Sequence, residues 1–159
     1  MISYDFDLIR KKRVRMTTAS AILSHSPVET RSLARRLAKK IRPGESLGLQ
    51  GPLGSGKTTF AKGVISELTG ISEEEIPSPT FTLVEEYPGG IYHVDLYRIE
   101  TIQEAAALPW DELLAPEAIT LVEWPENWPP LISHCQWHLQ FSKKDVDVRL
   151  IEISHKELE

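Results

Sequence analysis

Apolar residues in the first half of the chain recur at helical spacing in two stretches. Between residues 33 and 41 they follow one face of a helix. The preceding residues, Ser26-Pro27-Val28-Glu29, are typical of a helix N-terminus, with a serine cap, a proline at the first position and a glutamate at the third. Pro43-Gly44 predicts the end of this helix. A second helix is expected from about Gly56 to Leu68, before Thr69-Gly70.

Other segments carry the apolar runs and the alternation that are typical of strands. Residues 46–50 and 119–123 are short and largely apolar, as buried strands are. Two further pairs of segments flank turn residues and predict antiparallel hairpins, namely 82–87 with 91–97 and 136–141 with 147–153. A short helix is expected after Thr101, where Thr-Ile-Gln-Glu matches a capping box. Together these elements predict a three-layer α/β domain with a mixed, partly antiparallel sheet.

The composition fits one soluble domain. The chain has 159 residues, of which 41% are hydrophobic and 26% charged, and its mean hydropathy is -0.23. No apolar run approaches the roughly 20 residues that cross a bilayer, and the N-terminus lacks the apolar core of a signal peptide. We therefore expect a cytoplasmic protein without a membrane partner. Its one cysteine, Cys135, excludes an internal disulfide and a multi-cysteine metal cage.

Charge is distributed unevenly along the chain. The first 15 residues carry a net charge of +3, and the remainder carries -8. Residues 1–17 are expected to form a disordered basic extension before a domain over residues 18–159, and Met16 is an alternative start of translation. Residues 71–130 hold 13 acidic residues and one basic residue, Arg98, a balance that would repel a phosphate backbone. We therefore expect no DNA partner and no direct contact of this region with tRNA.

The candidate chemistry begins at a glycine-rich segment, Gly51-Pro52-Leu53-Gly54-Ser55-Gly56-Lys57-Thr58. It matches G-x-x-x-x-G-K-[ST] and lies between a predicted strand and a predicted helix, the context that a P-loop requires. Its glycines let backbone N–H groups converge on an anion, and the helix N-terminus adds partial positive charge. Lys57 is expected to reach the β- and γ-phosphates of a nucleotide, and Thr58 to ligate magnesium. The fold is therefore expected to be of the P-loop nucleoside triphosphatase type.

Two acidic residues compete for the carboxylate that a P-loop needs at the end of a neighbouring strand. Glu123 ends an apolar run, which is the pattern of a Walker B strand with glutamate in place of the commoner aspartate. Asp95 lies on a segment whose apolar residues take one face, leaving His93, Asp95 and Tyr97 on the other. Such a polar face indicates a site, and His93 is the only histidine that we place near it. The P-loop requires at least one of the two acids.

Four motifs, in this order, resemble the TsaE family, small bacterial ATPases of the tRNA threonylcarbamoyladenosine pathway. They are L-G-x-G-K-T-T-F at 53–60, S-P-T-F-T-L-V at 78–84, Y-H-x-D-L-Y-R at 92–98 and L-V-E-W-P at 121–125. With the helix after Ser26, the resemblance covers roughly residues 18–153. The chain departs from the family pattern at Pro52, where aspartate is usual, in the acidic, Pro-rich stretch 126–130 and in the extension before Met16.

The resemblance implies a catalytic role for residues in each of these motifs. ATP and Mg²⁺ are the implied cofactors, which Lys57 and Thr58 would serve, and Glu123 would complete the magnesium site. Asp95 would be a second essential acid, and Thr80 would lie in a mobile, switch-like loop. The resemblance also implies that Trp124 contributes to catalysis.

The resemblance also implies how the nucleotide and the partners are bound. The phosphates would be held by Leu53, Gly54, Ser55, Gly56, Lys57, Thr58 and Thr59. Ser26 and Arg149 match the family's adenine-side contacts by position. The implied partner is the heterodimer of TsaB and TsaD, which transfers a threonylcarbamoyl group onto adenosine in tRNA, so tRNA would be met only indirectly.

A small-molecule kinase of the P-loop class is the alternative function. A GTPase would carry N-K-x-D and D-x-x-G, and the sequence contains neither. A kinase would need cationic lid residues around the transferred phosphoryl group. After Lys62 the basic residues are only Arg98, Lys143, Lys144, Arg149 and Lys156. This shortage favours hydrolysis over transfer, and we expect hydrolysis to be slow until a partner accelerates it.

Overall fold

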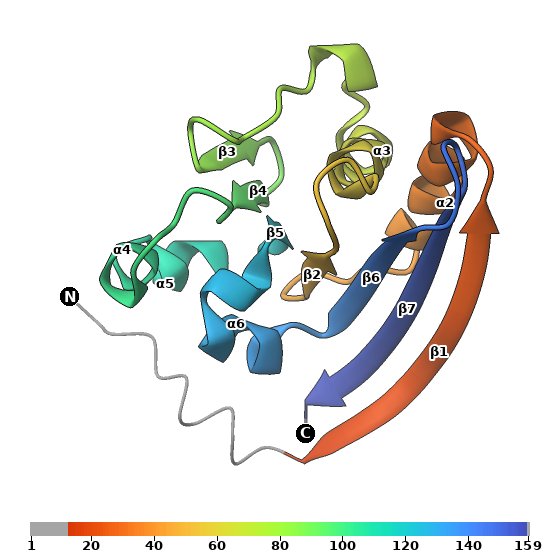
Figure 1. Cartoon of the computed structure of the whole chain (residues 1–159). Helices are drawn as coiled ribbons and strands as arrows, with labels where there is room; N and C mark the ends of the chain where they lie inside the picture. The colour runs from red at the N-terminus through yellow and green to blue at the C-terminus, as the bar shows by residue number, and fades with distance from the viewer. Residues whose placement is uncertain (1–12, 159) are drawn as a thin grey trace.

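Seven strands form one mixed sheet in the computed structural model, which describes residues 13–158 (Figure 1). The strands are β1 (Val14–Ser24), β2 (Ser46–Gln50), β3 (Val84–Tyr87), β4 (Ile91–Asp95), β5 (Ile119–Glu123), β6 (Trp137–Lys143) and β7 (Arg149–Leu158). Their order across the sheet is β1-β7-β6-β2-β5-β4-β3. The four strands from β6 to β4 are parallel, whereas β7, β1 and β3 run antiparallel to their neighbours. The predicted mixed, partly antiparallel sheet is confirmed.

Helices cover both faces of this sheet, which confirms the predicted three layers (Figure 1). On one side lie α2 (Pro27–Ala38) and α3 (Lys57–Thr69), and on the other α4 (Ile102–Ala106), α5 (Trp110–Leu113) and α6 (Pro129–His134). Two 3₁₀ turns, η1 (Glu73–Glu75) and η2 (Pro125–Asn127), complete the elements. Ser26 caps α2 as predicted, because its hydroxyl accepts a hydrogen bond from the Glu29 N–H at 3.1 Å.

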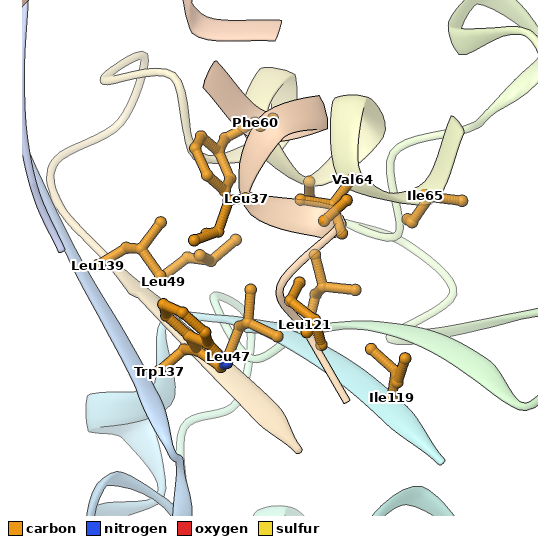
Figure 2. Packing of buried hydrophobic residues seen from close by; sticks show 14 of the residues in the cluster. Leu37, Leu47, Leu49, Phe60, Val64, Ile65, Ile119, Leu121, Trp137 and Leu139 are labelled. Carbon is orange, nitrogen blue, oxygen red and sulfur yellow. The ribbon is translucent and has the colours of Figure 1, made fainter. Parts of the chain in front are cut away.

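The larger apolar core lies between the α2–α3 layer and the central strands. Phe60, Val64 and Ile65 of α3 pack over Leu47 of β2 and Leu121 of β5, and all five are fully buried (Figure 2). Burial of each such side chain contributes about 1.5–3 kcal/mol. This packing fixes the N-terminus of α3 at the end of β2, where the P-loop segment lies.

The structure differs from the sequence-based expectations at the edge strand β1 and at the helix α6. Residues 14–16 belong to β1 and pair with β7, so this strand begins before residue 18, and residues 1–12 lie outside the described part of the chain. β1 was not predicted because its small, exposed side chains show no strong alternation, and its partner strand is remote in sequence. The helix α6 was also missed, because Pro129-Pro130 favoured a loop. Among the described residues, no helix is long and apolar enough to cross a membrane.

A buried carboxylate, Glu45, joins the start of β2 to β6 and β7. It accepts hydrogen bonds from the Trp137 Nε1–H at 2.9 Å, from the His155 Nε2 at 2.8 Å and from the Arg42 backbone N–H at 2.9 Å. Burial alone would raise the pKa of Glu45, but these hydrogen bonds together lower it below its ordinary value. The ionised form of Glu45 therefore stabilises the fold.

We expect the substitution Glu45→Gln to lower the free energy of unfolding by about 1–3 kcal/mol at pH 7, because buried donors lose a charged acceptor. Since the folded-state pKa lies below the ordinary glutamate value of 4.5, this stabilisation is complete above that value and is lost as the pH falls through the folded-state pKa. Denaturant unfolding across this range tests it, with Glu152→Gln, at an exposed position of β7, as control. A difference between wild type and Glu45→Gln that persists unchanged in acid would contradict this account.

Candidate functional site

The ends of three parallel strands meet at one cleft. β2, β5 and β4 lie side by side in that order, so their carboxyl ends share one edge of the sheet. The P-loop segment leaves β2 at this edge and leads into α3. A cavity of about 340 Å³ lies there. The catalytic, nucleotide-binding and metal-binding residues expected from the sequence all line it, and so do Pro27, Thr30, Tyr97 and Asp147, whereas His93 does not.

The loop between β2 and α3 has the backbone that an anion cradle needs. Gly54 and Gly56 adopt φ values of 69° and 101°, in the left-handed region that residues with a Cβ rarely enter. Gly56 is the N-cap of α3, so the first N–H groups of that 13-residue helix lie at the cleft. These free donors and the helix dipole favour a bound anion.

Lys57 is folded back onto this loop. Its Nζ donates to the carbonyl oxygens of Gly51 at 2.5 Å and Pro52 at 2.9 Å, and lies 4.4 Å from the centre of the Trp124 ring. Burial lowers the pKa of Lys57, although the carboxylates of Glu123, Glu126 and Asp95 oppose that shift. An ammonium group that is buried against two carbonyls and a ring gains a stronger partner if an anion enters the cleft.

Glu123 ends β5 directly beside the start of α3. The Thr58 hydroxyl donates to its Oε1 at 2.6 Å, and the His93 Nε2 lies 2.7 Å from its Oε2. Only 2% of Glu123 is exposed. The strand whose pattern is typical of Walker B therefore places its terminal acid against the P-loop threonine.

Asp95 lies opposite Glu123 in the pairing of β4 with β5. Its carboxylate accepts hydrogen bonds from the Tyr97 N–H at 2.9 Å and from the Thr80 hydroxyl at 3.2 Å. Burial raises the pKa of Asp95, and the nearby charge of Glu123 raises it further, while these hydrogen bonds oppose the shift. Both competing acids therefore reach the cleft, and Asp95 also ties the Thr80 loop to it.

Trp124 follows β5 in a left-handed conformation, with φ of 59°. That conformation is uncommon for a residue with a bulky side chain. The indole packs against the Tyr97 ring, with centroids 5.0 Å apart, and under the Lys57 ammonium. The aromatic pair thus forms one wall of the cleft beside the lysine.

Arg149 joins the turn between β6 and β7 to the P-loop. Its guanidinium donates to the carbonyl oxygens of Asp145, Val146 and Val148 at 3.0–3.2 Å and to that of Gly54 at 3.1 Å. It therefore holds the turn between β6 and β7 against the glycine-rich loop. Asp147 in this turn lines the cleft, and no motif in the sequence signals it. The contact of His93 with Glu123 was also missed, because strand alternation indicates a face but not a partner.

Comparisons with known proteins bear on the same residues. Residues 24–151 match the family model of threonylcarbamoyl adenosine biosynthesis protein TsaE. The chain belongs to the TsaE family. The match includes the P-loop segment and the two acids and reaches the start of β7, so all four motifs lie within it.

Individual members of the TsaE family resemble the chain to different extents. The tRNA threonylcarbamoyladenosine biosynthesis protein TsaE of Bacillus subtilis is 43% identical over 102 residues, which are 62% of this chain and 62% of that protein. The match thus spans less than two thirds of this relative. That of Aquifex aeolicus is 33% identical and covers 89% of this chain and all of the relative. The crystal structure of Bacillus subtilis YdiB superimposes with a TM-score of 0.69 at 30% identity over 89% of this chain and 88% of YdiB.

We expect Arg149→Met to loosen the turn between β6 and β7, because three carbonyls of the turn lose their donor. The N–H of Asp145 hydrogen-bonds the Val148 carbonyl inside this turn, so its exchange with solvent reports local opening. Exchange should accelerate about 10- to 150-fold, in line with about 1.5–3 kcal/mol for hydrogen bonds to a charged group. Lys144→Met, at an exposed position in the same turn, is the control. Equal exchange in both variants would show that Arg149 does not hold the turn.

Proposed function

We propose that the chain binds ATP with Mg²⁺ in this cleft and hydrolyses it as a component of tRNA threonylcarbamoyladenosine biosynthesis. The observation that carries the proposal is the contact between the P-loop and the acid that ends β5, made by Thr58 and Glu123 at 2.6 Å. Membership of the TsaE family supports the pathway. The succession of strand β2, glycine-rich loop and helix α3 supports the binding of a nucleoside triphosphate.

The phosphate groups would be held by the loop backbone and the first turn of α3. The two left-handed glycines would turn backbone N–H groups toward the anion, together with the first N–H groups of α3. Lys57 would exchange its two carbonyl partners for phosphate oxygens, which bind an ammonium group more strongly. Ser26 and Arg149 also line the cleft and would contact the adenine.

The donor set at the acid fits magnesium. Thr58 and Glu123 offer a hydroxyl and a carboxylate, the hard oxygen donors that Mg²⁺ prefers. The Thr58 proton points to Glu123, so the hydroxyl oxygen keeps lone pairs for a cation. A bound Mg²⁺ supplies positive charge against the phosphate oxygens. Glu123 and Thr58 would hold that ion beside Lys57.

Asp95, Thr80 and Trp124 act around the reacting phosphate rather than on the metal. The raised pKa of Asp95 suits a carboxylate that orients an attacking water and shares its proton. Thr80 donates to that carboxylate, so a shift of the Thr80 loop changes the orientation of Asp95. Trp124 covers Lys57 and limits the access of other water molecules.

Hydrolysis fits the charges around the cleft better than phosphoryl transfer to a small molecule. Among the described residues, Lys57 and Arg149 are the cationic residues that line the cleft, and Arg149 donates to four carbonyls. Arg98 points elsewhere, with its guanidinium carbon 4.1 Å from the centre of the exposed Phe81 ring. A kinase lid would need further cations.

The shortage of cations also implies a partner that completes the catalytic site. The partner proposed is the heterodimer of TsaB and TsaD, in the cytoplasm, with tRNA bound by the partner rather than by this acidic chain. Such a partner can supply an arginine in trans or order the loop that carries Thr80. ATP hydrolysis would then follow the state of the transferase complex.

We expect Lys57→Met to weaken binding of Mg·ADP about 10- to 150-fold, because hydrogen bonds to a charged group contribute about 1.5–3 kcal/mol, and to abolish hydrolysis. Calorimetric titration and a phosphate-release assay measure the two effects. Lys62→Met, which removes a lysine from the same helix outside the cleft, is the matched control. A folded Lys57→Met variant with wild-type turnover would refute the proposed site.

We expect the isolated chain to hydrolyse ATP slowly and the TsaB–TsaD heterodimer to accelerate it. An arginine supplied in trans raises phosphoryl-transfer rates by about 10³–10⁵ in related systems, which sets the upper range. Steady-state phosphate release with and without the heterodimer is the measurement. A free chain that turns over at about 1–100 per second, the range of kinases, and whose rate the heterodimer does not change would contradict this proposal. Such a result would favour the small-molecule kinase instead.

A further inference from the structure

His93 is a fully buried polar residue that the proposed chemistry leaves without a task. It lies in β4 with 0% exposure, two residues before Asp95 on the same face of the strand. Its Nδ1 has no hydrogen-bond partner within residues 13–158. An apolar residue at this position would avoid the cost of burying an unpaired polar atom. The hydrogen bond that offsets this cost is therefore the one made by its other nitrogen.

That other nitrogen contacts the acid of the proposed metal site. His93 Nε2 lies 2.7 Å from Glu123 Oε2, while Glu123 Oε1 accepts from Thr58 at 2.6 Å. The two oxygens of one carboxylate thus have separate partners on separate elements, β4 and α3. The parallel pairing of β4 with β5 holds the two side chains in this arrangement.

Without the His93 contact, the carboxylate of Glu123 could rotate toward the ammonium group of Lys57. Lys57 lies close enough for the charge of Glu123 to affect its pKa, and a Glu123 side chain that rotated toward this ammonium group would no longer direct Oε1 toward a metal ion. The contact from Nε2–H to Oε2 opposes that rotation, because the rotation would leave the buried N–H of His93 without an acceptor. Since His93 is fully buried, it reaches Glu123 but not the cleft.

We propose that His93 is a positioning residue, which donates from Nε2–H to Glu123 Oε2 and thereby keeps Oε1 and the Thr58 hydroxyl directed toward a divalent cation. The proposal rests on the proposed function, because it assigns a metal role to Glu123. A positioning role and a purely structural role of His93 predict different effects on ligand binding. Loss of the donor weakens binding of Mg²⁺ and leaves metal-free nucleotide binding unchanged.

The variants His93→Gln and His93→Met test this role in the full-length chain. Their side chains have the same length, but only glutamine places an N–H donor near the position of Nε2. ADP is titrated by calorimetry in EDTA and then at rising Mg²⁺ concentrations. We expect all three proteins to bind ADP equally in EDTA. The Mg²⁺ concentration for half-saturation should rise about 10- to 100-fold in the Met variant, the usual effect of removing a partner of a metal ligand, and stay near wild type in the Gln variant.

A double-mutant cycle with Glu123→Gln separates action through Glu123 from any other effect. If His93 acts through that carboxylate, His93→Met adds nothing to the Mg²⁺ dependence of a Glu123→Gln chain. Equal additional losses in both backgrounds would overturn the proposal, as would a Met variant with wild-type Mg²⁺ dependence. A wild-type chain whose ADP affinity ignores Mg²⁺ would instead overturn the proposed metal site itself. If the Met variant does not bind ADP in EDTA, the shorter His93→Asn replaces it under the same criteria.

Discussion

The buried carboxylate of Glu123 is the interaction on which the arrangement of the site depends. A charge with 2% exposure is stable only with close partners, and Glu123 has one on each side, Thr58 from α3 and His93 from β4. This requirement joins the P-loop helix to two neighbouring strands. It also explains why the end of β5, rather than a surface loop, carries the acid, because only there do the three elements converge.

The same edge of the sheet connects the cleft to an exposed segment. Asp95 lies beside Glu123 across the β4–β5 pair and accepts a hydrogen bond from Thr80. The next residue, Phe81, is 79% exposed and stacks with Arg98. A change at the phosphate end of the cleft can therefore reach the surface through one carboxylate and one hydroxyl. In the proposed function, this short path would let a partner influence hydrolysis without entering the cleft.

Local sequence patterns predicted the central strands of the fold, but they did not predict the pairing of strands that are far apart in the sequence. The bounds of β2 and β5 agree with the predicted strands because each is an apolar run that a glycine-rich loop or an acid ends. β1 pairs with β7 from the other end of the chain, and nothing local indicates that partner. In the site, the P-loop and both acids were predicted from motifs, whereas the contact between His93 and Glu123 depends on strand register. Asp147 lines the cleft only because Arg149 folds its turn back.

In the proposed function, one cleft binds a magnesium-bound nucleotide between the P-loop and Glu123. A crystal structure of the chain with Mg²⁺ and a non-hydrolysable ATP analogue tests it most directly. We expect Lys57 to have left the carbonyls of Gly51 and Pro52 for the phosphate oxygens, and the cation to lie against the oxygens of Thr58 and Glu123. A nucleotide bound elsewhere, or phosphates in this cleft with Lys57 still on its two carbonyls and the cation away from Glu123, would contradict the account.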